Sequence, residues 1–125
     1  LNITGGSIGR CALIPDNFTT ANVSQHVAIV RMIELETREY IHQFVISPGF
    51  QDRIMDVQVG VSREGLSMTK LKMFPTPLPS LDEQKVIVEK VNSLMALCDQ
   101  LEEAIILREE QAAQLMQSCV AEALA

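Results

Sequence analysis

The chain has 125 residues, of which 47% are hydrophobic, and its formal net charge is −6. This length suits one domain with an appendage, and the hydrophobic fraction is that of an ordinary globular chain. No run of about 18 apolar residues is present, so we expect no membrane-spanning segment, and the acidic balance excludes a protein that binds nucleic acid by overall charge alone.

The first third of the chain has the pattern of β segments joined by turns. Residues 1–14 predict a strand, a turn at Gly5-Gly6 and a second strand, and Pro15-Asp16-Asn17 predicts another turn. Residues 23–33 are again rich in β-branched and apolar side chains. Because the first residue already falls within a β segment, we expect that some strands of the complete domain are missing from this chain.

Two short helices are expected next. Residues 37–47 carry apolar side chains at helical spacing. Ser47 and Pro48 resemble an N-cap and a first helical position, so a second helix should follow. The apolar residues on one face of this second helix are Phe50, Ile54 and Val57. Residues 66–74 alternate instead, although imperfectly, which predicts an edge strand or a bulged strand.

A long helix is predicted at the end. Pro75, Pro77 and Pro79 predict an extended connection that cannot be a central strand. Ser80 can cap the helix that follows, and Glu83 completes a capping box. Apolar side chains then recur at spacings of four and three, as in a coiled-coil seam. The seam residues that we expect to contact a partner helix are Ile87, Val91, Leu94, Cys98, Leu101, Ile105 and Leu115.

These elements predict an α+β fold class: a small mixed domain of β strands with short helices at residues 1–80, then one long coiled-coil-type helix at residues 81–125. About 40 helical residues span roughly 60 Å, which an 80-residue globule cannot bury. The helix should therefore hold something at a distance or dock against a partner helix. Residues 81–125 hold nine acids and three bases, whereas residues 1–80 hold seven of each. Any contact with DNA would have to use the neutral globule, with help from a partner.

The glycine-rich loop from Gly5 to Arg10 has neither Walker nor dinucleotide-binding spacing. It predicts a tight turn at a hairpin or barrel corner.

Residues 20–26 interleave small apolar and polar side chains. Asn22 and Gln25 suit contacts with base edges, and Ser24 can reach a phosphate or a base edge. The alternative is a loop whose polar groups satisfy the local backbone, and we favour it for Asn22 and His26 individually. His26 has no second His or Cys nearby, so no metal role is expected.

Three further bases are candidates for DNA contact. Arg63 lies in a polar loop before Gly65, and the alternative is a surface salt bridge to Glu64. Lys70 and Lys72 would share one face of the predicted strand and could meet phosphate. Solvated edge lysines that prevent aggregation are the equal alternative.

Catalysis has no support in the sequence, which contains no Asn-Pro-Pro-Tyr motif, no Walker lysine loop and no metal-nuclease pattern. Cys11, Cys98 and Cys119 make an odd count without metal-ligand spacing, which suits the reducing cytoplasm. We therefore expect no enzymatic activity, no metal site and a cytoplasmic location. Two other interpretations stay open: a coiled-coil assembly protein with a small α+β head that binds protein only, and a small hydrolase that uses Cys11 or Ser7.

Several segments together carry a family resemblance: LNITGGSIGRCALIP, TANVSQHVAIVR and SREGLSMTKLKMFPTPLPSLDEQ, in that order, followed by the heptad repeat. They resemble the end of a target-recognition domain and the start of the spacer helix in the specificity subunit of type I restriction-modification enzymes. The resemblance implies that the chain recognises double-stranded DNA and holds no cofactor itself. It also implies that the tight turn in the glycine-rich loop presents Ser7 and Arg10 to DNA. It also implies a partner modification subunit that methylates DNA with S-adenosylmethionine, and an ATP-driven restriction subunit that cleaves it.

Subunits of that family carry two recognition domains and two spacer helices, whereas this chain matches about half of one repeat. We therefore expect a fragment or an unusually short half-subunit. The resemblance implies an antiparallel partner helix from the same chain, and because these residues contain no second long helix, we expect a two-fold homodimer instead. The recognised bases do not follow from the sequence, because readout also depends on DNA shape.

Overall fold

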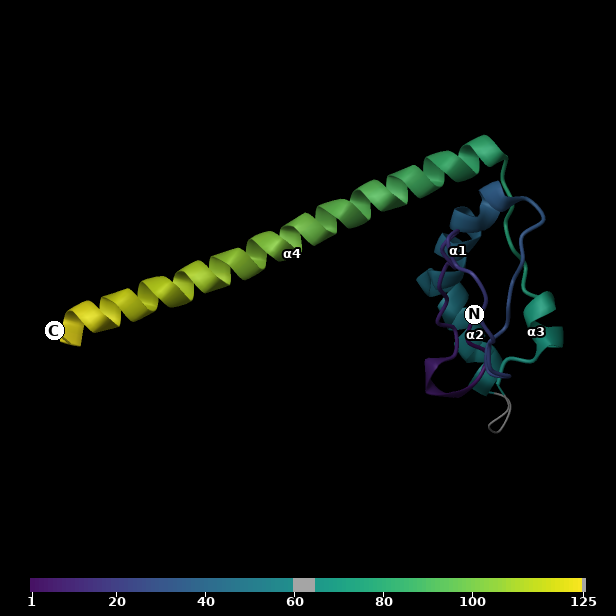
Figure 1. The fold of residues 1–125 in the computed structure, drawn as a ribbon, viewed down its shortest axis with the longest axis horizontal. Coiled ribbons are helices and arrows are strands. Elements are labelled where there is room, and N and C mark those ends of the chain that lie inside the picture. The colour runs from purple at the N-terminus through teal and green to yellow at the C-terminus, as the bar shows by residue number, and fades with distance from the viewer. Residues whose placement is uncertain (60–64, 125) are drawn as a thin grey trace. The chain divides into compact units, whose positions relative to one another are not determined.

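The structure is a computed structural model that describes residues 1–59 and 65–124 (Figure 1). The chain divides into two compact units, Leu1–Val88 and Glu89–Ala125, which we call the globular unit and the helical unit. The elements of the described residues are the 3₁₀ helices η1 (Gly5–Ser7) and η2 (Leu35–Thr37) and the α-helices α1 (Arg38–Ile46), α2 (Pro48–Val59), α3 (Met68–Lys72) and α4 (Leu81–Leu124).

The predicted α+β fold class is wrong, because the described residues are mostly helical and contain no sheet. Their β pairing amounts to an isolated antiparallel bridge between Asn2 and Val27. Asn2 also pairs with the end of the glycine-rich loop: its N–H donates to the Arg10 carbonyl at 2.8 Å, and its carbonyl accepts from the Gly9 N–H at 2.9 Å. These pairs are too few to form a ladder.

The residues that follow show why the strand prediction failed. β-branched side chains in an alternating pattern are typical of a strand in a half-buried sheet. A strand forms, however, only where a second backbone runs beside it and bonds to it. Among the residues described, such a neighbour exists only for residues 26–28, which pair with residues 1–3. The rest of residues 13–35 has none, and most side chains in the whole segment are exposed. The large apolar ones are Leu13, Ile14, Phe18, Val23, Val27, Ile29, Val30, Ile33 and Leu35.

The two middle helices are confirmed. Ser47 separates α1 from α2, and its hydroxyl donates to the Phe44 carbonyl at 2.6 Å. Its own carbonyl accepts the first helical bond of α2, from the Gln51 N–H at 3.0 Å. The predicted apolar face of α2 also turns inward, since Phe50 is 4% exposed and Ile54 is fully buried.

A small core joins four segments that lie far apart in the sequence. Its buried members are Ile8, Phe50, Ile54 and Leu66. The Phe50 ring packs edge-on against Phe44, with centroids 5.1 Å apart, and in a tilted arrangement against Phe74, with centroids 5.2 Å apart. Aromatic pairs at this separation stabilise a core beyond the area that they bury. The glycine-rich loop, α1, α2 and the α3 region are thereby held together.

The strand predicted at residues 66–74 is also wrong, because this segment contains α3. The Ser67 hydroxyl accepts from the Lys70 N–H at 3.3 Å and so caps the helix. Leu66 is buried, while Leu71 and Phe74 pack against the core. A spacing of three, as between Leu71 and Phe74, brings two side chains to one side of a helical turn but to opposite faces of a strand. The apparent alternation arose from Met68 and Met73, which are exposed.

The start of α4 belongs to the globular unit, and the predicted capping box is confirmed. The Ser80 N–H donates to the Glu83 carboxylate at 3.1 Å, and the Glu83 N–H donates to the Ser80 hydroxyl at 3.3 Å. Gln84 and Val88 are buried. The Gln84 amide donates to the Pro79 carbonyl at 2.9 Å, so the first turns of α4 are bonded to the proline connection.

The helical unit contrasts with this packed start. Val91 is partly buried, and every later described residue is exposed. The seam predicted between Ile87 and Leu115 is a continuous part of α4, but its apolar side chains face solvent.

Candidate nucleic-acid interface

Three loops that the sequence marked separately meet around the first four residues. The Ile3 N–H donates to the His26 carbonyl at 2.8 Å, and the Ile3 carbonyl accepts from the Leu66 N–H at 2.7 Å. The glycine-rich loop pairs with the same short segment through the backbone bonds of Gly9 and Arg10 to Asn2. Residues 5–10, 24–28 and 65–66 therefore surround one short extended segment.

Two glycines make this approach possible. Gly9 has φ +83°, a conformation that disfavours other residues, and a Cβ there would collide with the Gln51 side chain. The Gln51 amide bonds to the Gly9 carbonyl at 3.0 Å and to the Val45 carbonyl at 2.7 Å, which fastens the loop to α1 and α2. A Cβ at Gly65 would collide with the Ile3 carbonyl. Both glycines thus set how closely the loops pack.

The glycine-rich loop forms a 3₁₀ turn that separates its two candidate residues. The Ser7 hydroxyl is partly buried and accepts a hydrogen bond from the Asn2 side chain. The Arg10 side chain is exposed, and among the residues described it has no hydrogen bond or ion pair. Arg10 can therefore reach an anion without losing an internal contact, whereas Ser7 stabilises the turn.

The polar segment at residues 22–26 divides in the same way. The Ser24 hydroxyl accepts from the His26 N–H at 3.3 Å, and His26 Nδ1 bonds to the Thr4 hydroxyl. Asn22 and Gln25 are exposed, without hydrogen bonds to any residue that the structure describes. Two groups therefore hold the segment in place, and two amides are free to meet a ligand.

Lys70 and Lys72 lie in the last turn of α3, because the predicted strand is absent. Residues two apart on a helix do not face each other, so the expectation that they share one face is wrong. Lys70 is partly buried and Lys72 is exposed. Arg63 lies outside the described residues.

Ion pairs within the chain determine which basic side chains are free to contact DNA. Arg38 bonds to Asp16 at 2.6 Å, and this hydrogen bond and charge lower the pKa of Asp16 and raise that of Arg38. Lys85 bonds to Glu36 at 2.7 Å with the same two consequences. Within the described part of the globular unit, the bases without an ion pair are Arg10, Arg31, Arg53, Lys70 and Lys72.

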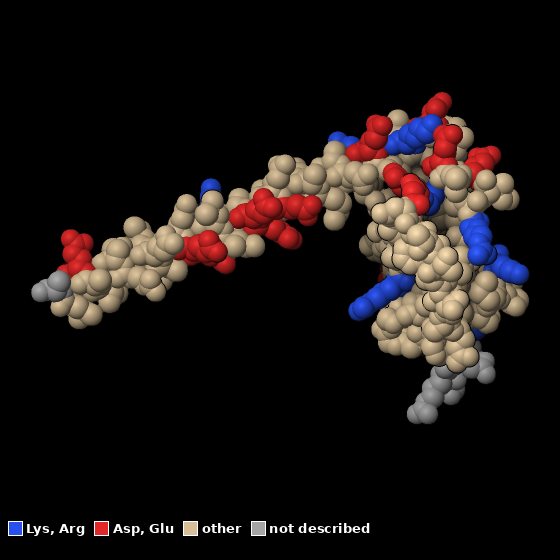
Figure 2. Space-filling view, viewed as in Figure 1, with Lys and Arg blue, Asp and Glu red and all other residues tan. Residues whose placement is uncertain are grey.

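The charge of the helical unit excludes it as a DNA-binding surface. Figure 2 shows acidic side chains along α4 with few basic ones, while the globular unit carries both signs. Residues 89–125 contain seven acids and two bases. A phosphate backbone would be repelled there, so the candidate interface is formed by the three loops together with Arg10, Lys70 and Lys72.

The sequence analysis missed Asn2 and Thr4, which connect the loops. The Asn2 side chain donates to Ser7, and its Oδ1 is buried without a hydrogen-bond partner among the described residues. The signal available in the sequence was that Asn2 is a polar residue between the apolar residues Leu1 and Ile3. The described residues hold no cluster of three potential metal ligands. They also include no helix that is both long and apolar enough to cross a membrane.

Comparison with known proteins identifies relatives. The sequence profile of the type I restriction modification DNA specificity domain matches residues 1–109. The type I restriction enzyme EcoBI specificity subunit of Escherichia coli is 30% identical over 101 residues, which are 80% of this chain and 21% of that protein. The StySPI specificity subunit of Salmonella potsdam is 32% identical over 60 residues, which are 48% of this chain and 13% of that protein. The chain thus spans about a fifth or less of the length of these relatives, and no solved structure gives a significant match.

Proposed function

Because the chain belongs to the family of the type I restriction modification DNA specificity domain, we propose that it recognises double-stranded DNA as part of a specificity subunit. The match of the family profile to residues 1–109 carries this proposal, since it includes the whole globular unit. The convergence of three loops, with free polar and basic side chains on them, supplies a surface of suitable chemistry.

The free side chains have distinct roles in this proposal. Asn22 and Gln25 carry amides, which form paired hydrogen bonds with an adenine edge in the major groove. Arg10, Lys70 and Lys72 supply charge for phosphates, which positions the chain without reading sequence.

Ser7 and Ser24 support their own loops through internal bonds and add a contact only at the rim. Arg63 remains a DNA-contact candidate.

The chain is not proposed to catalyse a reaction. Its relatives are specificity subunits, and its own role is to direct the other subunits. A modification subunit would transfer the methyl group from S-adenosylmethionine, and an ATP-driven restriction subunit would cleave DNA. The cytoplasm is the proposed location, where Cys11, Cys98 and Cys119 stay as the free thiols that the structure shows.

The exposed seam of the helical unit supports a further part of the proposal, a two-fold homodimer through α4. Leu94, Leu101 and Ile105 are each about half exposed. Antiparallel pairing of two seams would bury these side chains and keep the two recognition surfaces apart. Arg108 falls on the same repeat, so pairing should be strongest between residues 87 and 105.

The test uses the chain purified with its modification subunit and a duplex that the complex protects. Arg10→Ala should weaken binding to all duplexes similarly and lower the salt slope by about 1. Arg63→Ala should either do the same or, like Asn22→Ala and Gln25→Ala, cost about 1–3 kcal/mol at one base pair. Lys90→Ala, on the helical unit, is the matched control and should change neither quantity.

Circular dichroism separates these effects from unfolding, because exposed side chains can be removed without loss of helix. Unchanged affinity in the Arg10, Arg63, Asn22 and Gln25 variants would remove the loops from the DNA surface. A complex that assembles through α4 but shows no salt-dependent DNA binding would support the alternative, a coiled-coil scaffold whose head binds protein only.

A further inference from the structure

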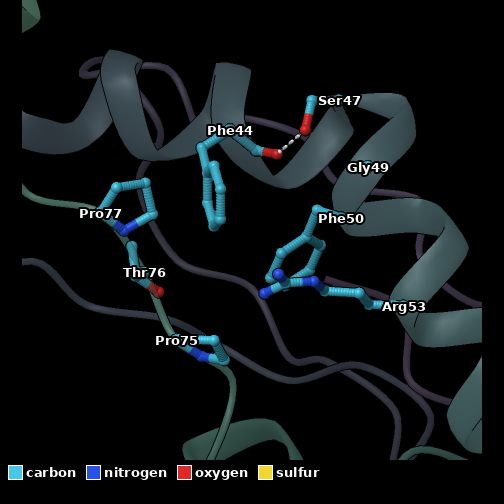
Figure 3. Close-up of a pocket in the computed structure, with 8 residues that line it drawn as sticks. All are labelled: Phe44, Ser47, Gly49, Phe50, Arg53, Pro75, Thr76 and Pro77. Carbon is cyan, nitrogen blue, oxygen red and sulfur yellow. Dashed lines mark hydrogen bonds between the residues drawn. The ribbon is translucent and has the colours of Figure 1, made fainter.

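The globular unit contains a pocket that the DNA-recognition role does not use. It has a volume of about 550 Å³ and lies between the end of α1, the first turn of α2 and the proline connection (Figure 3). Four rings, those of Phe44, Phe50, Pro75 and Pro77, form much of its lining, together with Thr76 and Arg53. This volume is in the range of pockets that hold ligands or inserted side chains.

The walls of the pocket are held in place by contacts with the core and with α1. Phe50 belongs to the core and packs edge-on against Phe44 at 5.1 Å. The Tyr40 hydroxyl donates to the Pro77 carbonyl at 3.2 Å, which holds the proline connection against α1. A pocket with fixed walls binds without the entropic cost of ordering them.

Arg53 gives the pocket its charge. Its side chain is exposed and, among the residues described, has no hydrogen bond or ion pair. Figure 3 shows it extending from α2, and it lines the pocket together with the rings. Of the lining residues it alone is ionisable, and no carboxylate in the lining neutralises it. The complement of this pocket is therefore an apolar group with an anion next to it.

We propose that this pocket docks a segment of a partner protein that presents a large apolar side chain beside a carboxylate. Phenylalanine and arginine are enriched where protein interfaces gain most of their binding energy. Interfaces with DNA are more polar and more strongly basic than a lining of Phe and Pro with one cation. A guanidinium bonds a carboxylate through two parallel N–H groups, which fixes the direction of the segment. This proposal goes beyond DNA recognition and does not rest on it.

The test titrates the intact 125-residue chain by NMR with the peptide acetyl-Leu-Glu-Leu-amide. Resonances of Phe44, Phe50 and Arg53 should shift, and the matched acetyl-Leu-Lys-Leu-amide should bind about tenfold or more weakly. Arg53→Gln should lower the affinity for the glutamate peptide to that for the lysine peptide. Arg31→Gln removes another unpaired arginine outside the pocket and should change nothing.

A second variant removes the space and keeps the charge. Thr76→Trp adds bulk at the exposed rim without altering the core, and it should abolish the shifts at Phe44 and Phe50. Equal binding of the two peptides, or shifts caused by a thymidine dinucleotide but by neither peptide, would overturn the proposal. The absence of any shift at low millimolar peptide would do so as well.

Discussion

The globular and helical units use the same helical periodicity with opposite results. In the globular unit, the apolar positions of α2 face a core, and Phe50 and Ile54 are 4% and 0% exposed. In the helical unit, apolar positions recur as regularly, yet Leu94 and Leu101 are 49% and 56% exposed. A periodic pattern thus specifies which face of a helix is apolar, but not what covers it. The globular unit covers the apolar face of α2, whereas the helical unit leaves its apolar positions exposed.

The largest expected effect comes from charging the seam. Leu94→Asp with Leu101→Asp should convert the proposed dimer into monomers in sedimentation. Each lost side chain forfeits roughly 1.5–3 kcal/mol, and two are lost in each copy, so association should weaken about ten-thousandfold or more. Leu107→Asp is the control, because Leu107 is as exposed but lies outside the seam. A wild-type chain that sediments as a monomer at high micromolar concentration would show that the seam has a different partner.

Truncating a core side chain should destabilise only the globular unit. Ile54→Ala should destabilise the globular unit by about 2–5 kcal/mol, since Ile54 is fully buried. Urea unfolding followed by the fluorescence of Tyr40, the sole tyrosine, reports on this unit. The neighbouring Met55→Ala removes a half-exposed side chain and should stay within about 0.5 kcal/mol. A similar loss in both variants would mean that position 54 is not part of a packed core.

Removing the cap tests the start of α4, which belongs to the globular unit. Ser80→Ala deletes the hydroxyl that accepts from the Glu83 N–H, and it should cost about 1 kcal/mol. Ser93→Ala removes a hydroxyl from the helix interior, where alanine is favoured, and should not destabilise. Hydrogen exchange at residues 81–84 provides the local measurement. Protection there that survives Ser80→Ala would show that packing of Gln84 and Val88 alone secures the helix start.

The smallest effect concerns the ion pair between Glu36 and Lys85. The bond to Lys85 lowers the pKa of Glu36, so the pair stabilises the fold above the unfolded pKa of Glu36 and is lost as pH falls through its folded value. The raised pKa of Lys85 places the other limit at alkaline pH, where the pair is lost as that lysine deprotonates. Lys85→Met should return the pKa of Glu36 toward 4.5 in an NMR titration. Asp16, paired with Arg38 instead, is the internal control and should keep its lowered pKa.

Local signals in the sequence were sufficient for α1, α2 and α4. The capping box at Ser80, the Ser47-Pro48 junction and the apolar face of α2 each depend on residues a few positions apart, and all three appear in the structure. The β segments depended on partners at long range, and the described chain pairs them at one bridge. For α3, the cap at Ser67 was a usable signal that two exposed methionines obscured.

The candidate site follows the same rule. Individual polar loops could be identified from composition, but not their convergence on Ile3, which bonds to residues 23 positions and 63 positions further along the chain. The sequence also did not predict which bases have an ion pair within the chain, because Arg38 and Arg53 look alike in it. Arg38 is paired with Asp16, whereas Arg53 has no ion pair with any residue that the structure describes.

The exposed apolar segment at residues 13–35 has a consequence for the life of the chain in a cell. Backbone amides and carbonyls without a ladder, beside side chains such as Ile14, Val30 and Ile33, form a template onto which another strand can add. Chaperones bind such segments and proteases cleave them. Limited proteolysis should therefore cut the chain within residues 13–35 before it cuts the helices.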